Sequence, residues 1–81
     1  MGIDEAKIIL REFLAGSFKI NDIKDDDDIF ETGIVHSLFF IQLLVFIEKK
    51  FKIELDAGEF NPDKLKTINV IAGLVIQKTL Q

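Results

Sequence analysis

Apolar residues recur at spacings of three and four in three stretches of the chain, which predicts three amphipathic helices. The first helix is expected over residues 4–15, with Asp4 as the cap at its start and Gly16 at its end. Its apolar positions are Ile8, Leu10, Phe13 and Leu14.

The other two long helices are expected over residues 37–50 and 68–80. The inward face of the helix over 37–50 is predicted from residues three or four apart, which are Ile41, Leu44, Ile47 and Phe51. Thr67 is the expected cap of the last helix. Its inward stripe consists of Ile68, Ile71, Leu74, Val75 and the stem of Lys78.

A short helix is expected over residues 62–65, because Pro62 suits a first helical turn and Asn61 suits the cap before it. No stretch alternates apolar and polar residues as a strand does, and no hairpin signal is present. A chain of 81 residues has the size of one domain. The predicted fold is therefore all-α, a four-helix bundle of three long helices and one short helix in a single domain over residues 1–81.

Residues 17–35 are rich in turn-forming residues and are predicted to form a long loop between the first two helices. Seven apolar residues are expected to hold this loop to the core: Phe18, Ile20, Ile23, Ile29, Phe30, Ile34 and Val35. A loop of this length in a small domain is usually functional. Its acidic run Asp25–Asp28 offers oxygen ligands for Ca²⁺ or Mg²⁺, but it lacks the alternating spacing of a calcium loop. A solvated acidic turn is the preferred interpretation.

Composition and charge narrow the classes of function. The net charge of −4 and the scattered basic residues argue against a nucleic-acid partner, and the absence of cysteine excludes disulfides and thiolate metal sites. The longest apolar stretch, residues 38–47, is interrupted by Gln42 and is too short to span a membrane. The first residues lack the basic and apolar segments of a secretory signal, so a cytoplasmic protein is expected.

Ser37 is the most informative polar residue, because it stands where the long loop becomes a helix. The first amide groups of a helix have no partner within the helix and form its positive end. An anion attached to Ser37 would therefore be stabilised. On position alone, Ser37 is equally a helix cap, since serine is a preferred residue there.

Four short motifs, taken in their order along the chain, help to interpret Ser37. They are Ile29-Phe30-Glu31, Gly33, Ser37-Leu38 and Glu48-Lys49-Lys50-Phe51. This arrangement resembles the acyl and peptidyl carrier proteins, in which an apolar-Phe-acid stretch and a turn precede Asp-Ser-Leu and the next helix ends in Glu-x-x-Phe. The resemblance covers nearly the whole chain and extends especially to small free-standing carriers such as the D-alanyl carrier proteins.

The resemblance implies that Ser37 accepts 4'-phosphopantetheine from coenzyme A through a phosphopantetheinyl transferase. The thiol of this arm would hold an acyl or aminoacyl group as a thioester for acyl- or aminoacyl-loading and acyl-processing enzymes. The chain itself would then be a monomeric shuttle and not an enzyme. The pathway stays open among fatty-acid, polyketide, nonribosomal-peptide and cell-wall aminoacyl biosynthesis.

Two departures from the family pattern concern partner recognition. His36 stands where the family usually has Asp, an acid implicated there in recognition and in metal-assisted attachment of the arm. His36 is either a residue for transferase or partner choice or a plain solvent-facing residue. The helix over 37–50 also lacks the outward acids of many family members. The predicted docking residues are His36, Leu38, Phe39, Gln42 and Phe46.

Other interpretations of these apolar residues and of Ser37 stay open. The loop over 17–35 covers Phe39 or Phe46 in one alternative, and in another some of the apolar residues line a cleft between the helices over 37–50 and 62–65 that shelters an acyl chain. An unmodified carrier fold that serves as a structural or regulatory interaction module is the alternative function. A hydrolase with His36 as base for Ser37 lacks a third orienting group and an oxyanion loop.

Overall fold

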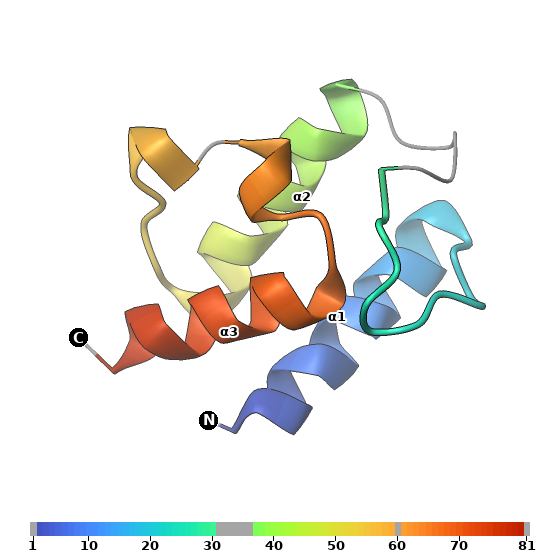
Figure 1. The fold of residues 1–81 in the computed structure, drawn as a ribbon, viewed down its shortest axis with the longest axis horizontal. Helices are drawn as coiled ribbons and strands as arrows, with labels where there is room; N and C mark the ends of the chain where they lie inside the picture. The colour runs from blue at the N-terminus through green and yellow to red at the C-terminus, as the bar shows by residue number, and fades with distance from the viewer. Residues whose placement is uncertain (1, 31–36, 60, 81) are drawn as a thin grey trace.

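The computed structural model describes residues 2–30, 37–59 and 61–80, and the backbone alone at Ser37. It contains three α-helices, α1 (Ile3–Phe18), α2 (Ser37–Phe51) and α3 (Ile68–Thr79), and two 3₁₀ turns, η1 (Ala57–Glu59) and η2 (Pro62–Lys64). In Figure 1, α1 and α3 lie side by side, and α2 descends from the top of the view towards α3. The described ranges contain helices and turns but no strand, which confirms the all-α prediction.

The predicted caps of the two C-terminal elements are confirmed. The Thr67 side chain accepts a hydrogen bond from the Val70 amide at 3.0 Å at the start of α3. The Asn61 side chain accepts one from the Asp63 amide at 2.9 Å. The short helix expected over 62–65 is a single 3₁₀ turn, however, so the count of four helices is not confirmed.

Helix α1 is longer at both ends than predicted. Its cap position is Gly2, whose backbone is extended, and Asp4 lies in the first turn without a capping hydrogen bond to the helix start. The helix passes through Gly16 and ends at Phe18, after which Lys19 adopts the left-handed conformation with φ 58°. The Lys19 amide donates to the Ala15 carbonyl at 3.1 Å. The prediction that Gly16 ends the helix is therefore wrong, because the extra turn allows Phe18 to pack against the core.

The buried face of α2 differs from the predicted one at three positions, which are Phe39, Ile41 and Leu43. Leu44, Ile47 and Phe51 are buried as expected, and Leu43 is fully buried beside them. Ile41, which is predicted to face inward, is 55% exposed, and Phe39, which is predicted to face outward, is 1% exposed. The rings that surround Phe39 explain this rotation of the helix.

Seven of the eight phenylalanines form a continuous chain of ring contacts that joins α1, the segment after it and α2. The successive pairs are Phe40–Phe30, Phe30–Phe39, Phe39–Phe18, Phe18–Phe13, Phe13–Phe46 and Phe46–Phe51. Phe39 lies in the middle of this chain, with Phe18 at 4.2 Å and Phe30 at 6.3 Å between ring centroids. Residues of the 17–35 segment thus cover Phe39, which is the alternative given above.

The segment after α1 is tied to the helices by its acidic run. Asp25 forms ion pairs with Arg11 and with Lys7, the latter at 3.2 Å, and its carbonyl accepts the Asn69 amide of α3. Asp27 and Asp28 accept backbone amides within the same segment. This run therefore makes structural contacts within the protein. Over the described ranges, no group of three or more acidic, histidine or cysteine side chains is arranged to hold a metal ion.

Within the described residues, no helix is long and apolar enough to cross a membrane.

Candidate carrier site at the start of helix α2

Ser37 is the first residue of α2, as the sequence predicts. The first turn of this helix contains no acidic residue, and the last turn contains Lys49 and Lys50. The free amide groups at the start of α2 thus face no carboxylate from their own turn, and an attached phosphate would meet a positive helix end. His36 and the rest of residues 31–36 lie outside the described residues.

An exposed apolar stripe follows Ser37 along α2. Leu38 is 57% exposed, Ile41 is 55% exposed and Val45 is 44% exposed, and their spacings of three and four place them on one side of the helix. We call these three residues the apolar stripe. Exposed apolar groups that gather on one side of a small protein are typical of a docking surface.

The predicted docking residues are only partly brought together. Leu38 and Gln42 are exposed next to each other, and Phe46 is half-buried. Phe39 is buried, so its assignment as a docking residue is wrong; His36 lies outside the described residues. Sequence reasoning missed Ile41. The signal was available in Gln42 and Lys49, because the polar residues of a helix mark its exposed arc, and Ile41 lies about 100° round the helix from Gln42, at the other edge of that arc.

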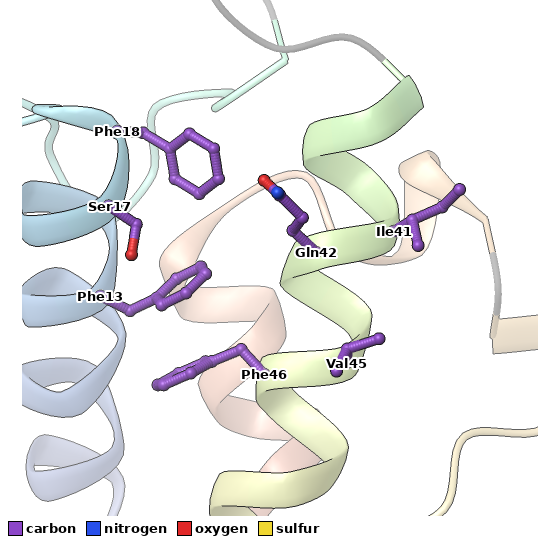
Figure 2. Close-up of a pocket in the computed structure, with 7 residues that line it drawn as sticks. All are labelled: Phe13, Ser17, Phe18, Ile41, Gln42, Val45 and Phe46. Atoms are coloured by element: carbon purple, nitrogen blue, oxygen red, sulfur yellow. The ribbon is translucent and has the colours of Figure 1, made fainter.

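A groove of about 580 Å³ lies between α1 and α2 (Figure 2). It is lined by Phe13, Ser17 and Phe18 of α1 and by Ile41, Gln42, Val45 and Phe46 of α2. Phe13 and Phe46 stack with ring centroids 4.0 Å apart and planes inclined by 15°. In Figure 2 the Gln42 side chain extends towards Phe18, whereas Ile41 and Val45 point to the other side of α2. The cleft expected between the helices over 37–50 and 62–65 stays a prediction.

The residues whose pKa values are clearly shifted lie outside this groove and form ion pairs within the fold. The Arg11 guanidinium and the Lys7 ammonium beside Asp25 hold the pKa of that carboxyl below its ordinary value of 3.8. At the other end of the molecule, Lys78 lies 2.8 Å from Glu59. Lys78 lowers the pKa of Glu59, and Glu59 raises the pKa of Lys78. The groove and the apolar stripe therefore present binding surfaces and contain none of these shifted groups.

The donor set at the start of α2 fits a covalently held phosphate ester. A serine begins the helix, its first turn has no acid, and the next residue, Leu38, faces solvent. A phosphodiester at this place would be stabilised by the helix end, and the stripe beside it would remain available for partner proteins.

Comparisons with known proteins agree with this arrangement. Residues 9–75 match the family model described as "Phosphopantetheine attachment site". The chain is similar to the D-alanyl carrier protein of Leuconostoc citreum (strain KM20), with 41% identity over 56 residues that cover 67% of this chain and 72% of the relative. It is also similar to the D-alanyl carrier protein of Streptococcus uberis (strain ATCC BAA-854 / 0140J), with 36% identity over 52 residues that cover 64% and 65% of the two chains.

Proteins of this family are carriers and not enzymes, and their prosthetic group is covalently attached 4'-phosphopantetheine. The match covers all of α2 and most of α1 and of α3. The chain therefore belongs to the phosphopantetheine attachment-site family of carrier proteins.

Proposed function

We propose that Ser37 holds the 4'-phosphopantetheine and that the chain carries an aminoacyl group, with D-alanine as the first candidate. The observation that supports the site most directly is the position of Ser37 as the first residue of α2, in a first turn without acids. The names of the similar D-alanyl carrier proteins favour an aminoacyl cargo over a fatty-acyl or polyketide cargo.

The residues of the chain hold and present this group. The start of α2 stabilises the negative charge of a phosphate on Ser37, because its first amide groups lack partners within the helix. When bound, the arm supplies a thiol for a thioester, and a thiolate leaves more readily than an alkoxide because a thiol has a pKa of about 8.5. Leu38, Ile41 and Val45 offer apolar area for a partner enzyme beside the attachment point.

The proposed partners are a phosphopantetheinyl transferase, an aminoacyl-loading enzyme and the enzyme that receives the cargo. We expect all three to dock on the apolar stripe together with Gln42 and His36. Tethering the cargo to the docked carrier raises its concentration at the partner's active site. The same proposal includes a cytoplasmic monomer, one carrier domain over residues 1–81, and a long connection from α1 to Ser37.

Intact mass spectrometry tests the attachment site. The protein is incubated with coenzyme A, Mg²⁺ and a broad-specificity phosphopantetheinyl transferase, beside the Ser37→Ala variant and a known carrier. We expect a single phosphopantetheinyl mass gain in the wild type and none in Ser37→Ala. An unchanged mass with this enzyme and with the host's transferases, while the known carrier is modified, would favour the unmodified interaction module.

The cargo is tested on the modified protein. It is incubated with ATP, D-alanine and a ligase that loads a D-alanyl carrier protein, with L-alanine as the comparison. We expect a further gain of one alanyl group with D-alanine that hydroxylamine removes, as a thioester requires. Loading by a fatty-acyl ligase in place of the D-alanine ligase would contradict the aminoacyl cargo and leave the attachment site intact.

A further inference from the structure

We propose that the near end of the groove between α1 and α2, formed by Ser17, Phe18 and Gln42, is a resting site for the phosphopantetheine arm of the chain itself. This use rests on the modification of Ser37 proposed above. The three residues lie at the end of the groove closest to the start of α2 (Figure 2). We call them the arm site.

The arm is long enough to reach the arm site. Helix α2 rises about 1.5 Å per residue, so Gln42 lies about 7.5 Å along the axis from Ser37. The extended arm has about as many chain atoms as four to five residues and spans about 15 Å. Gln42 also lies about 140° round the helix from Ser37, so a path over the helix surface past Ile41 measures about 15 Å, which the extended arm just spans.

The chemistry of the arm site matches that of the arm, which contains two amides separated by short apolar links. The carboxamide of Gln42 offers both a donor and an acceptor, and the Ser17 hydroxyl offers the same pair from α1. Both side chains are exposed, and neither is paired with another of the described residues. The half-buried Phe18 ring provides an apolar face for the methylene groups between the amides.

The groove floor also prevents the arm from entering more deeply. Phe13 and Phe46 stack face to face across the space between the helices, and Phe18 packs edge-on against both Phe13 and Phe39. These ring contacts close the interior between α1 and α2. The arm would therefore lie on the surface of the groove and would be released readily when a partner enzyme docks.

Nuclear magnetic resonance on the modified protein tests this placement directly. The ¹³C,¹⁵N-labelled protein carries an unlabelled arm, whose attachment is first confirmed by a single mass gain. We expect nuclear Overhauser contacts between the arm methylenes and the Phe18 ring, and shifts of the Gln42 side-chain amide between unmodified and modified protein. Gln42→Ala should remove the contacts, whereas Gln77→Ala, an exposed glutamine of α3, should keep them.

Thiol reactivity gives a second readout, because the chain has no cysteine and the arm carries its single thiol. Alkylation by iodoacetamide should be about fivefold faster in Gln42→Ala than in the wild type, the factor expected for one ordinary hydrogen bond. Circular dichroism verifies that both variants fold. The modified protein could instead show no arm contacts and the same alkylation rate as Gln42→Ala. With a single mass gain, that result would overturn the arm site but not the carrier function. The absence of any mass gain would overturn both.

Discussion

Leu38 and Phe39 are consecutive residues in the first turn of α2, and they face opposite environments. The Leu38 side chain is 57% exposed, whereas the Phe39 side chain is 1% exposed and lies between the rings of Phe18 and Phe30. One residue therefore faces solvent beside the proposed attachment point, while the next secures the start of α2 to the rest of the core. The two roles are separable by mutation.

Phe39→Ala should lower the free energy of unfolding by about 3 kcal/mol, because it removes a fully buried ring and leaves a cavity. Urea denaturation followed by circular dichroism measures the loss. Leu38→Ala is the matched control, and a change within about 0.5 kcal/mol is expected for this exposed neighbour. Phe39→Leu is the milder change for the case that the alanine variant does not fold, and a loss of about 1 kcal/mol is expected. Equal losses at positions 38 and 39 would contradict the burial of Phe39.

Ile41→Ala should slow modification of Ser37, because it removes exposed apolar area from the proposed docking surface. We expect kcat/KM of a phosphopantetheinyl transferase to fall about fivefold, which corresponds to a contact worth about 1 kcal/mol at an interface. Ile8→Ala is the matched control, since Ile8 on α1 is 57% exposed and Ile41 is 55% exposed. An equal effect of the two changes would argue against docking through the apolar stripe.

Local sequence signals predicted the elements that local interactions determine. The Thr67 and Asn61 caps form because a side-chain oxygen satisfies an amide two or three residues further on, and such contacts depend on short spacing alone. The start of α2 at Ser37 was also predicted. These features need no knowledge of the distant chain.

The wrong predictions concern positions whose structure depends on contacts with residues far away in the sequence. Gly16 and Ile41 were assigned from local propensity and spacing, but Phe18 extends α1 beyond Gly16 and the rings around Phe39 turn α2 so that Ile41 faces outward. When nearly every residue of a helix is apolar, spacings of three and four fit more than one face, so they do not determine which face is buried. The contact of Phe39 with Phe18, which lies 21 positions earlier, cannot be read from either segment alone.

Gly16→Ala should stabilise the protein by about 0.5–1 kcal/mol, because glycine inside a helix retains more freedom in the unfolded chain than alanine does. A Cβ atom added at Gly16 meets no atom within 4 Å, so no steric penalty opposes the gain. Thermal and urea denaturation measure it. Gly73→Ala in α3 is the parallel case, with equal space for a Cβ atom. Destabilisation by Gly16→Ala would indicate that α1 ends before this residue.

Asp25→Asn should lower stability at neutral pH and have a diminishing effect in acid. The hydrogen bonds from Arg11 and Lys7 hold the pKa of the Asp25 carboxyl below its ordinary value of 3.8. The charged carboxylate therefore stabilises the folded protein. This contribution is complete above the ordinary pKa, which the unfolded chain has, and is lost as the pH falls through the lower folded pKa. Urea denaturation of wild type and variant at pH 7 and at successive values below 4 should therefore show a difference that shrinks with acid. Asp22→Asn, at an exposed aspartate outside these ion pairs, is the control and should follow the wild type throughout. The free energy of unfolding could instead differ between wild type and Asp25→Asn by the same amount down to pH 2. That result would mean that the ion pairs do not hold the segment after α1 in place.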